Sequence, residues 1–169
     1  MAEMKQQREK SVSRFPHIGK ILILLLLMGG WLVLMWRLSA ANGTETLKDS
    51  MRFAKKIGAL LYQNPTAEQL AALNLKLRKM AHVFLYAGLG TMMTLLFHWL
   101  LYRFSIWKQA IPAIVCCTII AFADELQKIP IAGRHFSFSE SLLNAGSAAA
   151  MTGILLLFCW VKTHKSTGA

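Results

Sequence analysis

Ionisable and amide side chains gather at the ends of three long apolar runs in this chain of 169 residues. Carboxylates and a histidine can move protons, while arginine and lysine can hold a phosphate or a carboxylate. The residues that we single out as a candidate binding site are Lys79, His82, Tyr86, Asp124, Glu125, Arg134, Glu140 and Asn144.

Two adjacent carboxylates close the third apolar run. Asp124 and Gln127 are spaced i, i+3, as are Glu125 and Lys128, so each pair shares one face of a helix. Glu125 and Lys128 therefore either form a salt bridge at the helix end or belong to a reactive site. In the reactive alternative, Glu125 or Asp124 is the base and His82 is the partner acid, and these three residues are the catalytic candidates.

The second run opens with polar residues at helical spacing. Lys79, His82 and Tyr86 recur at i, i+3 and i+7, which predicts that they share one helix face. His82 has two interpretations. It is either a neutral imidazole hydrogen-bonded to a neighbouring carboxylate, or a proton acceptor or cation partner.

The connection before the fourth run carries Arg134. This connection, residues 130–138, is short and partly apolar and is expected to dip toward the helices, where a guanidinium can clamp a carboxylate or phosphate. Ser137 and Glu140 fit a helix capping box, which gives Glu140 a structural explanation. Asn144 precedes a run of small residues, so we expect close helix packing with Asn144 hydrogen-bonded across helices.

These side chains must be positioned by apolar elements. Hydrophobic residues make up 55% of the chain and the mean hydropathy is +0.43, which is too apolar for an ordinary soluble domain. Four runs approach the roughly 20 residues that a membrane-spanning helix needs. The predicted fold is an all-α integral membrane protein with four transmembrane helices and an amphipathic helical first loop. The membrane domain covers 18–161, with spans at about 18–36, 80–101, 110–129 and 141–161.

Alternating membrane crossings bring the polar residues together. The start of the second span, the end of the third and the start of the fourth then lie on the same side of the membrane. Charged groups at membrane depth are costly and by default indicate function. The sequence therefore predicts a polar site at one face of the membrane.

The termini indicate an orientation. Residues 1–17 form a basic tail that the positive-inside rule assigns to the cytoplasm, and the C-terminal tail at 162–169 is assigned there as well. The first loop, residues 37–79, carries eight Lys and Arg, so a simple count of basic residues does not decide the orientation. The first span is longer than the hydrophobic part of a usual signal peptide, which favours a retained anchor over a cleaved signal. We therefore expect a multi-pass protein of the cell membrane with both termini in the cytoplasm.

The first loop is itself predicted to be helical. From Leu47 to Leu61, apolar residues recur every three or four positions with basic residues between them. This pattern predicts a helix that lies on the membrane surface or packs on the bundle. Thr66 and Gln69 fit a capping box, so a second helix is expected to begin there and to run directly into the second span.

Composition and motifs exclude several function classes. The net charge is +11, but the basic residues lie mostly beside apolar spans, where anionic lipid headgroups are their expected partners. No recognition helix, zinc-finger spacing or RNA-binding motif occurs, so no nucleic-acid partner is expected. Cys116, Cys117 and Cys159 lie inside spans and predict neither a disulfide nor a metal site, and no motif indicates a cofactor.

At the polar residues, the chain resembles the VanZ-like family of small bacterial membrane proteins. The family pattern is Arg-Lys-x-x-His-x-x-x-Tyr, Asp-Glu, Gly-Arg and acidic-x-x-x-Asn, in this order. It is matched by residues 78–86, Asp124-Glu125, Gly133-Arg134, and Glu140 followed by Asn144. The resemblance spans about residues 18–158. The chain departs from the pattern where Lys128 stands in place of the usual Gln, Glu140 in place of Asp, and Ser147 in place of Gly.

The resemblance implies a role at the cell envelope. The family's named member gives low-level resistance to teicoplanin, a glycopeptide antibiotic that targets cell-wall precursors. An envelope protein of Gram-positive-type bacteria that alters how a glycopeptide reaches its target is therefore implied. No particular reaction is implied.

Three functional hypotheses follow. In the first, a non-enzymatic membrane protein binds membrane lipids, a lipid-linked cell-wall precursor or a glycopeptide, with Lys79 and Arg134 contacting phosphate. In the second, a small membrane enzyme acts on a lipid-linked phosphate or peptide. In the third, the carboxylates neutralise Lys79, Arg134 and Lys128 in a structural ionic lock. We favour the first hypothesis, and the sequence assigns neither a specific ligand nor an oligomeric state.

Overall fold

The computed structural model of the chain describes residues 18–40 and 43–167. These residues form five helices and no strand: α2 (Ile18–Ala40), α3 (Gly43–Leu61), α4 (Ala67–Leu100), α5 (Ile106–Leu126) and α6 (Phe138–Thr167). The all-helical part of the predicted fold is therefore confirmed. The prediction for the basic tail at 1–17 lies outside the described residues, and α6 continues beyond residue 161, where the fourth span was expected to end.

Four of these helices are long and apolar enough to cross a membrane. They are α2, α4, α5 and the part of α6 from Phe138 to Val161. α5 begins before the predicted third span, at Ile106, and ends at Leu126, so Lys128 follows the helix rather than continuing it. The four helices indicate a multi-pass membrane protein, in agreement with the sequence-based expectation.

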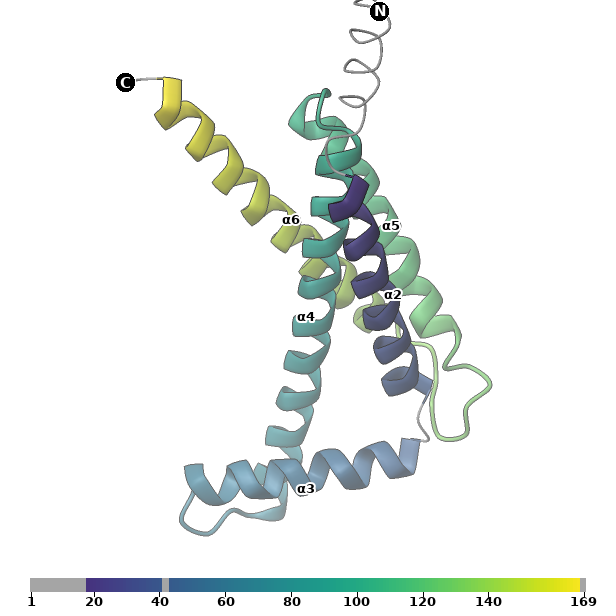
Figure 1. Ribbon diagram of the computed structural model, residues 1–169. Helices are drawn as coiled ribbons and strands as arrows, with labels where there is room; N and C mark the ends of the chain where they lie inside the picture. Colours follow the sequence, from purple (N-terminus) through teal and green to yellow (C-terminus); the bar gives the residue numbers. More distant parts are fainter. Residues whose placement is uncertain (1–17, 41–42, 168–169) are drawn as a thin grey trace, which may run out of the picture.

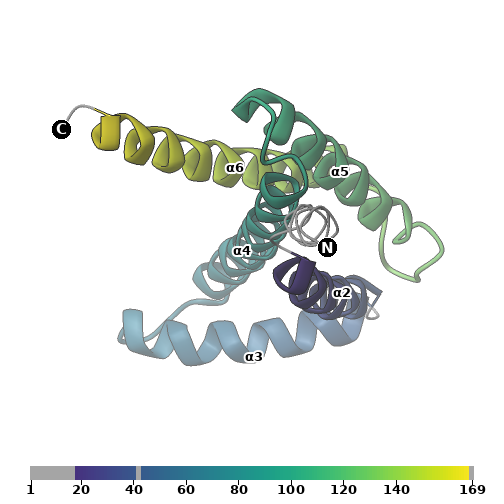
Figure 2. The same ribbon diagram turned by 45° about the horizontal axis from the view of Figure 1, so that its top comes forward.

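α4, α5 and α6 pack together as the centre of the bundle, and α2 lies against α4 (Figures 1 and 2). The C-terminal half of α6 points away from the other helices in both views. α3 lies crosswise beneath the bundle and packs on the first turns of α4 (Figure 1). The ends of α2 and α5 and the start of α6 therefore all lie on the side of the bundle that faces α3.

Small residues bring α4 and α6 into close contact. A Cβ atom added at Gly90 would lie 2.6 Å from the carbonyl oxygen of Ala148, so only glycine fits at this approach. One turn further along both helices, the hydroxyl of Thr94 donates to that of Thr152 over 3.0 Å. These contacts agree with the predicted close packing of the small residues on α6.

α2 is fixed to α4 at one crossing point. The indole N–H of Trp31 donates to the carbonyl oxygen of Leu85 over 3.0 Å. A Cβ atom at Gly88 would lie 2.6 Å from the Trp31 ring, so glycine allows the indole to approach. Apolar residues cover the outer face of α2, and many are exposed, including Leu26 and Leu27. An exposed apolar face of this kind is typical of a helix in contact with lipid.

α3 is the amphipathic helix that the sequence predicts. Its Ala54 and Gly58 are buried, and Gly58 lies under Leu70 of α4, so α3 packs on the bundle. The Thr66 capping box is also confirmed, because the N–H of Thr66 donates to Gln69 Oε1 (2.9 Å) and the N–H of Gln69 donates to Thr66 Oγ1 (3.2 Å). α4 then continues without a break into the second span, as expected.

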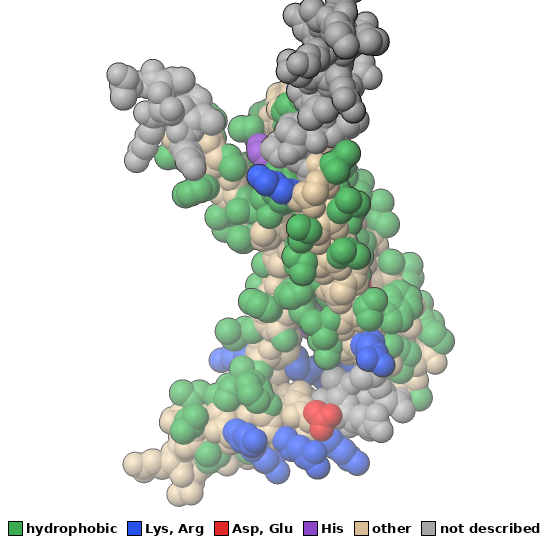
Figure 3. All heavy atoms as spheres, viewed as in Figure 1, with side chains coloured by type: hydrophobic (Ala, Val, Ile, Leu, Met, Phe, Trp, Pro, Cys, Tyr) green, Lys and Arg blue, Asp and Glu red, His purple; other side chains and the backbone are tan. Residues whose placement is uncertain are grey.

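The distribution of side chains separates the two ends of the molecule. Hydrophobic groups cover most of the bundle, whereas Lys and Arg gather on α3 and at the adjoining end of the bundle (Figure 3). This end is the one to which the sequence assigns the polar site.

Candidate functional site

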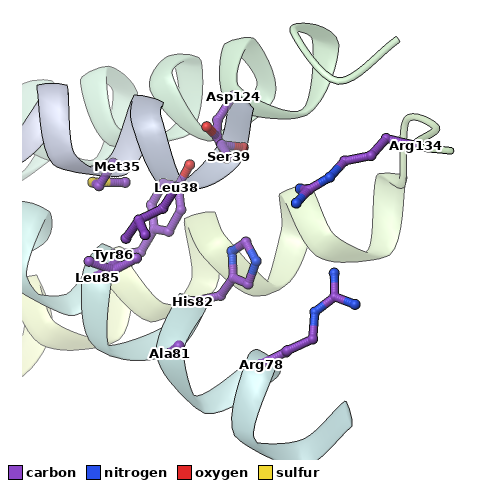
Figure 4. A pocket seen from close by; sticks show the side chains of 10 residues that line it. All are labelled: Met35, Leu38, Ser39, Arg78, Ala81, His82, Leu85, Tyr86, Asp124 and Arg134. Carbon is purple, nitrogen blue, oxygen red and sulfur yellow. The ribbon is translucent and has the colours of Figure 1, made fainter. Parts of the chain in front are cut away.

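Four of the eight predicted site residues, His82, Tyr86, Asp124 and Arg134, line a pocket of about 160 Å³ beside α4 (Figure 4). α2, α4, α5 and the connection between α5 and α6 each contribute to its walls. The lining residues are Met35, Leu38, Ser39, Arg78, Ala81, His82, Leu85, Tyr86, Asp124 and Arg134. We call it the first pocket.

A second pocket of about 420 Å³ adjoins the first on the side of α3. Its lining surface is about half polar and half apolar, and Leu47 of α3 contributes to it. Its lining residues are Leu47, Arg78, Lys128, Gly133, Arg134, His135, Ser137 and Glu140. Arg78 and Arg134 line both pockets, so these two guanidinium groups lie where the pockets meet.

Arg78 and Arg134, which we call the arginine pair, come from different elements. Arg78 extends from α4 and Arg134 from the connection between α5 and α6, and both side chains reach toward the space beside His82 (Figure 4). Gly133 has a φ of 75°, a conformation that favours glycine, and so turns the chain into Arg134. Burial, followed by the charge of Arg78, lowers the pKa of Arg134, but a guanidinium remains protonated in proteins.

A second charged group, the ion triad, lies at the junction of α5 and α6. The ammonium of Lys128 contacts Glu125 and also Glu140, the latter at 3.3 Å. The side chains of Lys128 and Glu125 are 4% and 0% exposed, whereas that of Glu140 is 39% exposed. A buried charge needs such a partner, because removing one member leaves the other uncompensated. The predicted Glu125–Lys128 salt bridge is therefore present, with Glu140 as a third member.

The two adjacent carboxylates have separate surroundings. Asp124 lines the first pocket and accepts a hydrogen bond from Gln127 Nε2 at 2.7 Å, as its spacing predicts. The hydroxyl of Tyr86 points toward Asp124 in Figure 4. Glu125 lines neither pocket and accepts from the N–H of Ser137 at 3.4 Å. Of the two carboxylates, only Asp124 is thus positioned to meet a ligand in the first pocket.

Lys79 does not belong to the face that the sequence assigns to it. It is exposed and lines neither pocket, whereas its neighbour Arg78 lines both. The face of α4 that looks into the first pocket is centred on Arg78, His82 and Leu85, so Lys79 points to one side of it. Arg78, which the family motif contains but periodicity alone does not select, therefore lines the pockets where Lys79 was expected.

The predicted capping box at the start of α6 is only half formed. The N–H of Glu140 donates to Ser137 Oγ at 3.3 Å, as predicted. The carboxylate of Glu140 contacts Lys128 instead of returning to Ser137, and Glu125 receives the Ser137 N–H in its place. A carboxylate from α5 thus completes the cap of α6 and links the two helices.

Asn144 differs most from expectation. It is fully buried, but within the described part of the chain neither its amide oxygen nor its amide nitrogen has a hydrogen-bond partner. The predicted cross-helix hydrogen bond is therefore wrong. The contacts of Gly90 and Thr94 with α6 place Tyr86 level with Asn144 by helical register. A buried polar group without a partner costs about 1–3 kcal/mol, which makes Asn144 an unexplained polar group at membrane depth.

Among the described residues, no group of three His, Cys, Asp or Glu side chains is arranged to hold a metal ion. The first pocket offers two arginines, a histidine and the carboxylate of Asp124 as its polar groups. These groups can bind an anion, and Asp124 with His82 could exchange protons with it.

Comparisons of this chain with protein-family models, with curated proteins and with solved structures found no match. The fold and site define a helical protein with four membrane-length helices and a charged pocket at one end. The resemblance to the VanZ-like family remains a prediction from the motifs.

Proposed function

We propose that this chain is a VanZ-like, multi-pass protein of the cell membrane that binds an anionic, phosphate-type group at one membrane face. The observation that carries the proposal is the arginine pair, because Arg78 and Arg134 both border the two adjoining pockets. Two guanidinium groups in one space repel each other unless an anion lies between them. Each guanidinium has five donors and can bind phosphate with two hydrogen bonds, even where it also has another partner.

The charges of the two pockets favour an anion. In the first pocket, the arginine pair faces one carboxylate, Asp124, which Gln127 already contacts. In the second pocket, the pair is joined by Lys128 and faces one carboxylate, Glu140. Because the two pockets share the arginine pair, their combined lining holds three cations and two carboxylates, which gives a net charge of +1 with the histidines neutral.

The bound group is proposed to belong to a membrane lipid or a lipid-linked cell-wall precursor. With both termini in the cytoplasm, the polar site faces outward, where such precursors meet glycopeptides. By its resemblance, the protein would then alter how teicoplanin reaches its target in a Gram-positive-type envelope.

The ion triad favours a second, structural role for three of the polar residues. Lys128 contacts both Glu125 and Glu140 at the junction of α5 and α6, which fits the ionic-lock hypothesis for these residues. The enzymatic alternative keeps Asp124 and His82, which share the first pocket, but loses Glu125 as its base because Glu125 borders neither pocket.

The proposal is tested by teicoplanin susceptibility of a sensitive Gram-positive host that expresses the chain. We expect wild type and the control Lys79→Gln to protect the host, whereas Arg78→Gln and Arg134→Gln do not, at matched membrane levels. Retention of phosphatidylglycerol by the purified proteins in neutral detergent should fall in the same two variants. Protection that survives both arginine substitutions would contradict the proposed site, and no protection by wild type would contradict the role in resistance.

A further inference from the structure

We propose that the anionic ligand is a lipid, and that its hydrocarbon chain leaves the first pocket sideways between α2 and α4. This inference rests on the proposed function, because it takes the arginine pair as the seat of the phosphate. It adds the path that the hydrocarbon chain takes out of the pocket and the residues that line this path.

The size of the first pocket supports this inference. Its volume of about 160 Å³ is below the range of about 300–1,000 Å³ that is usual for pockets enclosing a whole small molecule. A phosphate and a few attached atoms fit, so the rest of the ligand must extend out of the pocket.

The walls of the first pocket indicate the direction. Away from the arginines the lining is apolar, and it includes Leu38 of α2 and Ala81 of α4, which are both exposed (Figure 4). About half of the second pocket's lining surface is polar, whereas that of the first pocket is predominantly apolar and offers a hydrocarbon chain more apolar contact. Burial of apolar surface stabilises a bound chain by about 0.8 kcal/mol per CH₂ group, so the chain is expected to follow the side of α2 and α4.

The contact between α2 and α4 closes the space between these helices at one end of the first pocket. Trp31 bonds to the carbonyl oxygen of Leu85 and packs on Gly88, so the two helices touch there. Between that crossing and the arginine pair lies the first pocket, with Met35, Leu38 and Ser39 of α2 on one wall. A chain that starts at the arginines therefore meets the crossing and must turn outward into the bilayer.

Ser39 provides an independent indication of a ligand. It is 6% exposed and lines the first pocket, yet its hydroxyl has no hydrogen-bond partner among the described residues. Ser39 lines the same pocket as Asp124 and Arg134. A phosphate or ester oxygen in the pocket would satisfy this buried hydroxyl.

The test compares two probes with the same headgroup on the purified full-length chain in neutral detergent. One probe is phosphatidylglycerol, and the other is glycerophosphoglycerol, which lacks the acyl chains. Binding is measured by titration with native mass spectrometry. The variant Ala81→Phe places a bulky side chain in the apolar wall of the first pocket. Ala123→Phe is its control, because Ala123 is exposed near the C-terminal end of α5 and lines neither pocket. Leu38→Trp narrows the opposite wall and replaces Ala81→Phe if that variant does not fold.

We expect wild type to bind phosphatidylglycerol at least about tenfold more tightly than glycerophosphoglycerol. Ala81→Phe should weaken phosphatidylglycerol binding by about tenfold or more, and Ala123→Phe should change it by less than about twofold. Arg78→Gln should weaken the binding of both probes.

Two outcomes would overturn the inference and leave the proposed function intact. One is equal affinity for the two probes, and the other is a normal affinity of Ala81→Phe and Leu38→Trp for phosphatidylglycerol, in each case with Arg78→Gln still impaired. The ligand would then enter from water. Normal binding by Arg78→Gln and Arg134→Gln, or no saturable binding by wild type, would instead overturn the proposed function and the inference together.

Discussion

The ion triad and the arginine pair occupy the same end of the bundle but are built in opposite ways. In the triad, Lys128 lies between Glu125 and Glu140, and the contacts are buried at the junction of two helices. In the pair, Arg78 and Arg134 come from separate elements and border two pockets. The charges of the triad contact one another, whereas the charges of the pair border two pockets.

The two groups differ in how far apart their charged residues lie in the sequence. Glu125 lies at the end of α5 and Lys128 lies three residues further on, in the turn that follows, so their contact is local in the sequence. Arg78 and Arg134 meet only when α4 and the connection after α5 are brought together. A local pair lends itself to joining helices, while a pair assembled from distant elements lends itself to a binding site. We therefore expect the stability of the fold to depend on the triad and the binding of a ligand to depend on the pair.

The largest effect is expected in the triad. Lys128→Met leaves Glu125 buried beside Glu140 without its cation, and the loss of one partner of a buried ion pair typically costs about 3–5 kcal/mol. The variant should show a strongly lowered thermal unfolding temperature in detergent and a low membrane level. Lys79→Met, which removes an exposed lysine, is the matched control and should unfold like wild type. Equal stability of the two variants would mean that the triad does not hold the helices together.

An intermediate effect is expected in the arginine pair, and it should appear only with ligand. Arg78→Gln and Arg134→Gln should unfold near the wild-type temperature without lipid, because a mutual repulsion is relieved when one guanidinium is removed. Saturating phosphatidylglycerol should raise the unfolding temperature of wild type, since a ligand at about 100 times its Kd stabilises by about 2.7 kcal/mol. The arginine variants should lose most of this rise, which differential scanning fluorimetry measures. If they are as unstable as Lys128→Met without lipid, the arginine pair is structural as well.

Local contacts of this molecule were predictable from sequence. The Thr66 cap and the pairing of Asp124 with Gln127 depend on residues three positions apart, and helical spacing alone specifies them. The convergence of three chain segments at one end also followed, because apolar runs of membrane length must alternate in direction. The sequence thus predicted at which end of the bundle the polar residues lie, but not how their side chains are arranged there.

The contacts that sequence could not supply depend on which neighbour each face meets. Arg78 rather than Lys79 lines the pockets because α2 and the connection after α5 approach that side of α4, and periodicity does not specify their approach. The N–H of Ser137 donates to Glu125 of α5 instead of to Glu140, which lies three residues further along the chain. These contacts depend on how the helices pack against each other, which the pattern of a single sequence does not specify.

The smallest effect on stability is expected at Asn144, which belongs to neither charged group. Its amide has no partner among the described residues, so Asn144→Leu removes a buried polar group without breaking a hydrogen bond. Such an exchange is nearly neutral or stabilising, and we expect the unfolding free energy to change by no more than about 1 kcal/mol. Asn144→Asp, which puts a charge in the same place, should by contrast destabilise strongly. A large loss of stability in Asn144→Leu would show that the amide is bonded in the folded protein and that Asn144 belongs with the triad. Unchanged stability with reduced binding of phosphatidylglycerol would instead assign Asn144 to the binding site together with the arginine pair. Asn144 lies one helical turn beyond Glu140 on α6.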